Sequence, residues 1–279
     1  MSKIFGTADR VELYAWANGE PYTISSLKEM LESGGATRKA AYQRALAVFE
    51  EFERRHRILG TAYPFELNDE SIRSLVMNAA SPYLYCVALS ELQDEHIDED
   101  VRGERFELLA MRAAESFFGG KGIRIGAPWK NEETPEYADL LLRVTSLISE
   151  LGPPVVDTAP GGGDGGWDLL IVKNFADDDI SRFIAIGNCA SGKTNWRHKW
   201  KETAANYFWD FFRHKPVSAW IEFFAVPFVI DEDMRRRKCD ARTITLDRLR
   251  IAEHAATLDS RSEKWLESVR AKAADLPLI

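Results

Sequence analysis

The chain has 279 residues, of which 45% are hydrophobic and 29% charged, and its formal net charge is −8. These values are typical of a globular protein, and they exclude attraction to nucleic acid through an overall positive field. The three cysteines are widely spaced and odd in number, which argues against a disulfide framework or a zinc site. We find no signal peptide and no long apolar span, so we expect a cytoplasmic protein that does not enter a membrane.

The first ninety residues have a helical pattern. The spacing of apolar residues predicts helices over about 8–17, 25–34 and 37–57, with Ser25 or Ser26 as the cap of the second. An extended segment at 61–67 follows, and we expect helix again over 71–92. Three helices and an extended segment permit a winged-helix interpretation, with DNA contacted by the second or third helix. Sparse basic residues favour the alternative, a helical domain that supports the core or binds a partner.

An acidic stretch with few apolar residues, Glu91–Asp100, predicts a solvated linker. The boundary gives a helical accessory domain at 1–95 and an α/β core at 96–279. In the core we expect a helix at 103–118, a strand at 121–127, a helix at 135–151, strands within 217–230 and at 243–246, and a final helix at about 260–274.

The centre of the chain contains two short apolar runs. A glycine-rich turn, Gly161–Gly166, leads into Trp167–Val172, and a polar turn separates this run from Arg182–Asn188. Both runs are short, β-branched and bounded by turn residues, which predicts two strands of a hairpin. The sequence from Asn195 onward has helical spacing.

Polar residues stand near the same end of this hairpin. Asp168 begins the first strand and Asn188 ends the second, so we expect their side chains to converge at one end of the sheet. Together with an upstream glutamate, such groups would form a magnesium or manganese site for phosphodiester hydrolysis.

The stretch resembles the PD-(D/E)xK nuclease superfamily, in the branch with the pattern G-G-x-D, then a polar residue followed by C-A-x-G, then N-W-x-x-K. The resemblance covers about residues 101–230. The matching residues are Gly165, Gly166, Asp168, Asn188, Cys189, Ala190, Gly192, Asn195, Trp196 and Lys199. It implies a restriction-endonuclease-like mixed sheet flanked by helices.

The same resemblance implies site residues. In this superfamily the first helix of the core often supplies a glutamate to the metal ion, a role for Glu107, with Glu104 as the competitor. From its place in the glycine turn, Asp164 is a candidate accessory carboxylate, and stabilisation of the turn is the alternative role. These residues would join Asp168 and Asn188 around the metal ion.

Two positions depart from the superfamily pattern. Asn188 stands where Glu, Asp or Gln is usual, and Ala190 stands where the strand lysine is expected. Some members supply the lysine from the following helix, which gives this role to Lys199, with Lys193 as the fallback. Trp196 would anchor that helix against the sheet. An inactive site that only binds nucleic acid is an alternative.

Two other motifs compete with the nuclease interpretation. Residues 187–194, G-N-C-A-S-G-K-T, match a phosphate-binding loop in which Lys193 would reach nucleotide phosphates and Thr194 a magnesium ion. The glycines at 161, 163 and 166 match a dinucleotide fingerprint, but they precede a strand instead of opening a helix, so we reject it.

The sequence therefore favours a metal-dependent endonuclease. By family analogy the substrate is DNA, reached through local basic groups such as those at 235–238. Such cores often serve as effectors of bacterial defence against phage, so we also expect a protein partner or a homo-oligomer.

Overall fold

The computed structural model describes residues 3–75, 81–92, 99–126, 136–156, 166–177, 179–192, 196, 207–238 and 243–277. The chain forms two compact units. Unit 1 comprises Met1–His96, Pro227–Asp231 and Arg248–Ile279, and unit 2 comprises Ile97–Val226 and Glu232–Asp247. Within the described ranges, no helix is both long and apolar enough to cross a membrane.

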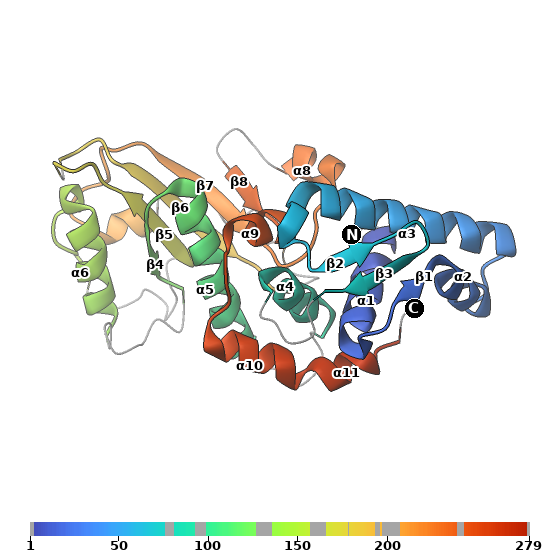
Figure 1. Ribbon diagram of the computed structural model, residues 1–279. Coiled ribbons are helices and arrows are strands. Elements are labelled where there is room, and N and C mark those ends of the chain that lie inside the picture. Colours follow the sequence, from blue (N-terminus) through green and yellow to red (C-terminus); the bar gives the residue numbers. More distant parts are fainter. Residues whose placement is uncertain are drawn as a thin grey trace. The chain divides into compact units, whose positions relative to one another are not determined.

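Unit 2 is built on a five-stranded mixed sheet (Figure 1). Its strands follow one another in chain order, with β4, β5 and β6 antiparallel and β6, β7 and β8 parallel. The strands are β4 (Lys121–Arg124), β5 (Leu169–Lys173), β6 (Phe183–Cys189), β7 (Trp220–Ala225) and β8 (Thr243–Leu246). The α/β class, the mixed sheet and the central hairpin are thus confirmed.

Helices pack on the two faces of this sheet. On one face lies α5 (Glu99–Phe118), and it approaches so closely that a Cβ on Gly122 would come within 2.5 Å of Met111 Cγ. On the other face lies α6 (Tyr137–Leu147), whose Leu140 belongs to the same apolar core cluster as Leu170 and Ile186 of the sheet. Short helices η2 (Ser149–Leu151), η4 (Phe208–Phe211) and α8 (Glu232–Lys238) complete the described part of unit 2.

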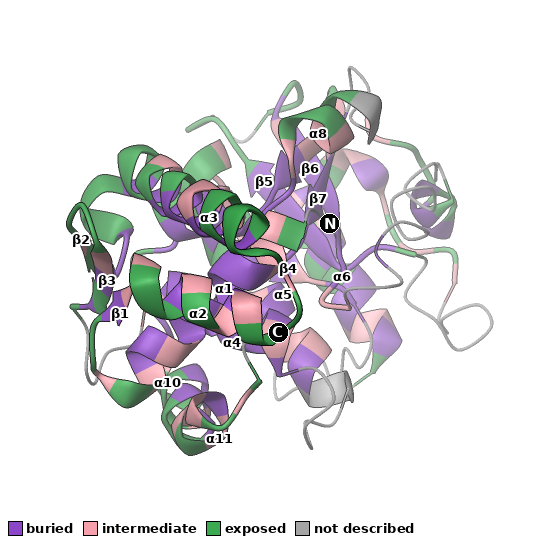
Figure 2. Ribbon diagram, turned by 90° about the vertical axis from the view of Figure 1, so that its right-hand side faces the viewer, coloured by how far each residue is buried: buried purple, intermediate pink, exposed green. Residues whose placement is uncertain are grey.

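Unit 1 begins with three helices and a small antiparallel sheet. The helices are α1 (Lys3–Asn18), α2 (Ile24–Ser33) and α3 (Arg38–Leu59), and Figure 2 shows buried and exposed residues alternating along α3. The strands β1 (Tyr22–Thr23), β2 (Phe65–Leu67) and β3 (Ser71–Ser74) lie in the order β1-β3-β2. This order of helices followed by a hairpin is compatible with the winged-helix interpretation.

Two local predictions for unit 1 were wrong. The cap of α2 is Thr23, whose Oγ1 accepts the Ser26 N–H at 3.0 Å, not Ser25 or Ser26. Residues 71–74 form a strand instead of a helix. The reason is an Asx turn, in which Asn68 Oδ1 accepts the N–H groups of Glu70 and Ser71 and turns the chain back into a hairpin.

The predicted domain division also needs correction. The boundary near residue 96 agrees with the structure, but α9 (Arg248–His254), α10 (Ser260–Ser268) and α11 (Arg270–Ala274) belong to unit 1 rather than to the core. There they join α4 (Pro82–Glu91) and α1, because Arg270 donates to the Ala17 carbonyl and Arg248 pairs with Asp9. Such pairing across 239 residues has no local signature in the sequence.

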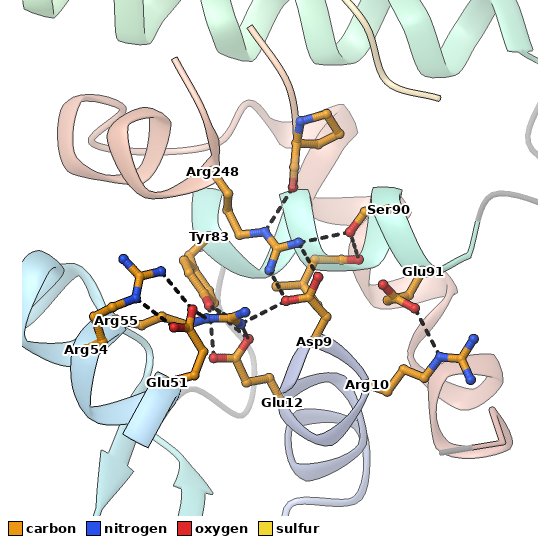
Figure 3. Close-up of polar contacts among 12 residues, drawn as sticks. Asp9, Arg10, Glu12, Glu51, Arg54, Arg55, Tyr83, Ser90, Glu91 and Arg248 are labelled. Atoms are coloured by element: carbon orange, nitrogen blue, oxygen red, sulfur yellow. Dashed lines mark hydrogen bonds and ion pairs between the residues drawn. The ribbon is translucent and has the colours of Figure 1, made fainter. Parts of the chain in front are cut away.

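A network of buried charges holds unit 1 together (Figure 3). The Arg248 guanidinium donates to both Asp9 oxygens, at 2.6 and 2.9 Å. Arg55 contacts Asp9, Glu12 and Glu51 at 2.7–2.8 Å. Glu12 also accepts the hydroxyl groups of two tyrosines, Tyr63 and Tyr83. These contacts connect α1, α3, α4 and α9 within a single cluster.

The network separates the pKa values of its two innermost acids. Burial raises the pKa of Asp9, but the charges of Arg248 and Arg55 outweigh it and lower the value from 3.8 to about 2. Burial likewise raises the pKa of Glu12, and there the charge of Arg55 does not fully offset it. Because the folded-state pKa of Asp9 is depressed, its stabilising contribution is present above pH 3.8 and is lost as the pH falls toward 2.

Substituting Arg248 by methionine should destabilise unit 1 strongly. The change leaves Asp9 as a buried charge with one cation fewer, which typically costs about 3–5 kcal/mol. Urea denaturation followed by tryptophan fluorescence measures this loss. Arg57→Met, at an exposed position of α3, is the matched control and should leave the midpoint unchanged. Equal midpoints for the two variants would contradict the importance of the pair.

Candidate functional site

Asp168 and Asn188 lie on neighbouring strands. Asp168 directly precedes β5, Asn188 is in β6, and both are buried. Leu169 pairs with Gly187 in the antiparallel register, and the Cys189 N–H donates to the Asp168 carboxylate, so Asp168 lies beside the end of β6 that contains Asn188. The two positions thus stand at the same end of the hairpin. Convergence of the Asp168 and Asn188 side chains, and metal binding by Asn188, stay predictions.

The end of the sheet is irregular around Asp168. Its backbone carbonyl accepts the N–H groups of both Ile125 and Gly126, and its own N–H donates to the Gly187 carbonyl. Two donors opposite one acceptor is the pattern of a β-bulge, a feature that ends regular pairing and redirects a side chain. The Asp168 carboxylate is held in turn by the Cys189 N–H, which donates to Oδ2 at 2.6 Å.

The second carboxylate comes from α5. Glu107 is 7% exposed, and its Oε2 accepts a hydrogen bond from Arg124 Nε at 2.6 Å. A Cβ built on Gly126 would lie 2.9 Å from Glu107 Oε2 and also 2.9 Å from Asp168 Oδ1. The two oxygens are therefore no farther apart than twice 2.9 Å. The two carboxylates thus converge on the position that a Cβ of Gly126 would occupy.

The other expected site residues have different outcomes. Trp196 is 4% exposed, and its role as the anchor of a helix against the sheet stays a prediction. Asp164, Lys193 and Lys199 lie outside the described residues. On α5, Glu107 is the glutamate that approaches Asp168, so the competing residue Glu104 is no longer needed for the site.

Three features of the site were not anticipated from the sequence. They are the Arg124 side chain on Glu107, the glycine at 126 and the backbone N–H of Cys189. A charged residue between two isoleucines, at Arg124, was the one available signal. A bulge and a backbone donor depend on tertiary geometry and leave no mark in a single sequence.

The donors suit a hard cation. Among the described residues, no group of three or more His, Cys, Asp or Glu side chains forms a metal site. Glu107 and Asp168 supply two carboxylates, and an asparagine amide oxygen is a third donor that Mg²⁺ or Mn²⁺ accepts. Two convergent carboxylates thus fit a magnesium-type ion that keeps several water or phosphate ligands.

Comparison with protein-family models, with curated proteins and with solved structures found no match to this chain. The argument for its chemistry therefore depends on the geometry of the site and on the sequence motifs.

Replacing Gly126 by alanine should disturb the carboxylate pair directly. The added methyl group would lie 2.9 Å from both oxygens, so one or both carboxylates must move. We expect weaker Mn²⁺ binding in a calorimetric titration, by about tenfold or more, as for other changes that misplace metal ligands. Gly103→Ala is the matched control, because its methyl group would make an ordinary 3.9 Å contact with Glu107. Equal Mn²⁺ affinity of the two variants would contradict the site.

Proposed function

We propose that this chain is a metal-dependent nuclease with a restriction-endonuclease-like core in unit 2, and that it hydrolyses phosphodiester bonds of DNA. The observation that carries the proposal is the convergence of two buried carboxylates, Glu107 and Asp168, at the end of the central hairpin. Buried acids are costly unless they are paired or bind metal, and Arg124 is one cation that contacts this pair, through Glu107.

The order of elements supports the proposal. The helix carrying Glu107 is followed by three antiparallel strands, and a fourth strand, β7, is parallel to β6. The motif residues Asp168 and Asn188 stand at adjacent strand ends, where a nuclease of this kind needs them. The motif residues and the strand order thus point to the same end of the sheet, where β5 begins and β6 ends.

Each residue has a distinct role in the proposal. Asp168, Glu107 and the Asn188 amide would hold Mg²⁺ or Mn²⁺. When bound, the ion polarises the scissile phosphate and lowers the pKa of the attacking water. Lys199 would orient that water or neutralise developing negative charge. Asp164 would be an accessory carboxylate.

Unit 1 would present substrate or bind a partner. The net charge of −8 does not attract DNA by itself, so recruitment by a protein partner or by assembly of several copies would place the site on its substrate. A cytoplasmic defence effector against phage is the setting that we propose for such an enzyme.

A phosphate-binding loop at 187–194 is less well supported. Gly187, Asn188 and Cys189 are residues of β6, and Gly187 pairs with Leu169 across the hairpin. The loop motif needs its residues to leave the strand and wrap a phosphate with backbone N–H groups. The Cys189 N–H instead donates to Asp168.

A binding subunit without catalysis is the second candidate. Ala190 removes the strand lysine, and the Arg124–Glu107 ion pair already neutralises one proposed ligand. Both features would suit a fold that binds nucleic acid and no longer cleaves it.

Plasmid nicking distinguishes these candidates. We expect cleavage of supercoiled DNA with Mg²⁺ or Mn²⁺ and none with EDTA. Asp168→Ala should lower the rate by at least about 100-fold, because it removes a metal ligand. Asp210→Ala, at an exposed side chain of unit 2, should retain the wild-type rate. DNA binding without any metal-dependent nicking would favour the binding subunit.

The two lysines separate the nuclease from the nucleotide-binding interpretation. If Lys199 replaces the strand lysine, Lys199→Ala should reduce cleavage by about two to three orders of magnitude, whereas Lys193→Ala should leave most of the rate. Initial rates of nicking measure both. An active Lys199→Ala protein beside an inactive Lys193→Ala protein that has lost ATP binding would overturn the nuclease proposal.

A further inference from the structure

Arg124 occupies a particular place beside the two carboxylates. It is the last residue of β4 and pairs in the antiparallel register with Leu169, the residue that follows Asp168. Its side chain is 9% exposed, that of Glu107 is 10% exposed, and the two are joined by the 2.6 Å contact. A guanidinium group keeps its charge under all conditions relevant to a protein. A permanent, nearly buried positive charge therefore lies at the candidate site.

The positive charge of Arg124 offsets repulsion between the two nearby carboxylates. Glu107 and Asp168 converge on the position that a Cβ of Gly126 would take, and like charges this close repel each other strongly when water is largely excluded. The Cys189 N–H offsets part of the charge on Asp168, and Arg124 offsets that on Glu107. Arg124 thus allows the two acids to stay close before any metal ion binds.

The reaction proposed for this site needs a cation near the metal ligands. In hydrolysis the water oxygen bonds to phosphorus, the ester P–O bond breaks, and a proton passes from the water to solvent while the leaving oxygen gains one. Negative charge grows on the phosphate oxygens during this exchange, and a fixed positive charge stabilises it. The superfamily pattern supplies a strand lysine, whereas this chain has Ala190.

We propose that Arg124 is the cation that replaces this lysine in neutralising the phosphate, which leaves Lys199 to orient the attacking water. The inference rests on the proposed nuclease function and divides the two roles that were left to Lys199. It follows from the position of Arg124 on the strand next to Asp168 and from its direct contact with a proposed metal ligand. Arginine also suits a phosphate better than lysine, because its planar fork presents two parallel donors.

Three substitutions separate charge from packing. Arg124→Lys keeps the charge but loses the fork, Arg124→Gln keeps a hydrogen-bond donor for Glu107 but loses the charge, and Arg124→Ala loses both. Arg143→Ala, at an exposed position of α6, is the matched control. We expect kcat for plasmid nicking to decrease in the order wild type, Lys, Gln and Ala, with a loss of about 100-fold for Gln. The control should equal the wild type.

Mn²⁺ affinity without DNA provides a readout that does not depend on catalysis. Removing a positive charge beside the carboxylates should leave Mn²⁺ binding by Arg124→Gln as tight as in the wild type, or tighter, in a calorimetric titration. A structural partner of Glu107 would behave otherwise. Its loss would weaken Mn²⁺ binding and lower the melting temperature together with the cleavage rate.

The outcomes distinguish the proposed role of Arg124 from the proposed nuclease function on which it rests. A wild-type protein that binds Mn²⁺ but never nicks DNA would end the nuclease proposal. An active wild type with an Arg124→Gln variant of equal kcat, or one with Mn²⁺ affinity lost, would overturn the role of Arg124 alone. If Arg124→Ala fails to fold, the comparison of the Lys and Gln variants still decides between charge and packing.

Discussion

The hydrogen bond from the Cys189 N–H to Asp168 fixes the geometry of the candidate site. Here the Asp168 side chain, instead of a backbone carbonyl, accepts the Cys189 N–H. The regular ladder of backbone hydrogen bonds between β5 and β6 therefore ends at this point. The bulge opposite Asp168, where Ile125 and Gly126 share one carbonyl, brings β4 to the same carboxylate. Three strands thus meet on one aspartate, and helix α5 adds Glu107 to it. The helix must lie close to the sheet for this, which explains the need for glycine at 122 and 126.

Unit 1 depends on a different constraint, its buried charges. Burying Asp9, Glu12, Arg55 and Arg248 together costs desolvation energy that apolar residues would not, so the network is a poor route to stability alone. Its geometric effect is to join distant segments, because Arg248 donates to Asp9, to Ser90 and to the Pro227 carbonyl. The C-terminal residues are thereby tied to the first helix. Truncating the chain after the α/β core would therefore remove part of unit 1.

The sequence predicted the fold well wherever the signal was local. Apolar periodicity located α1, α3, α5 and α6, and the two apolar runs gave the hairpin of β5 and β6. It failed where the outcome depended on distant partners. The side chain of Asn68 decided that 71–74 would be a strand, and Asp9 decided the domain of α9. At the site, the positions of Asp168 and Asn188 followed from strand order, whereas the roles of Arg124 and Gly126 required the structure.

The ion pair between Arg124 and Glu107 bears on whether such a site is active or degenerate. Two converged, buried acids repel each other, and an apolar replacement for either acid would relieve that repulsion. In this chain Arg124, Gly126 and the Cys189 N–H instead accommodate the pair. A divalent cation would bind the two acids in the enzyme that we propose and equally in a binding subunit that lacks the strand lysine. The acids therefore support the proposed metal site, whereas the choice between enzyme and binding subunit depends on the cations around it.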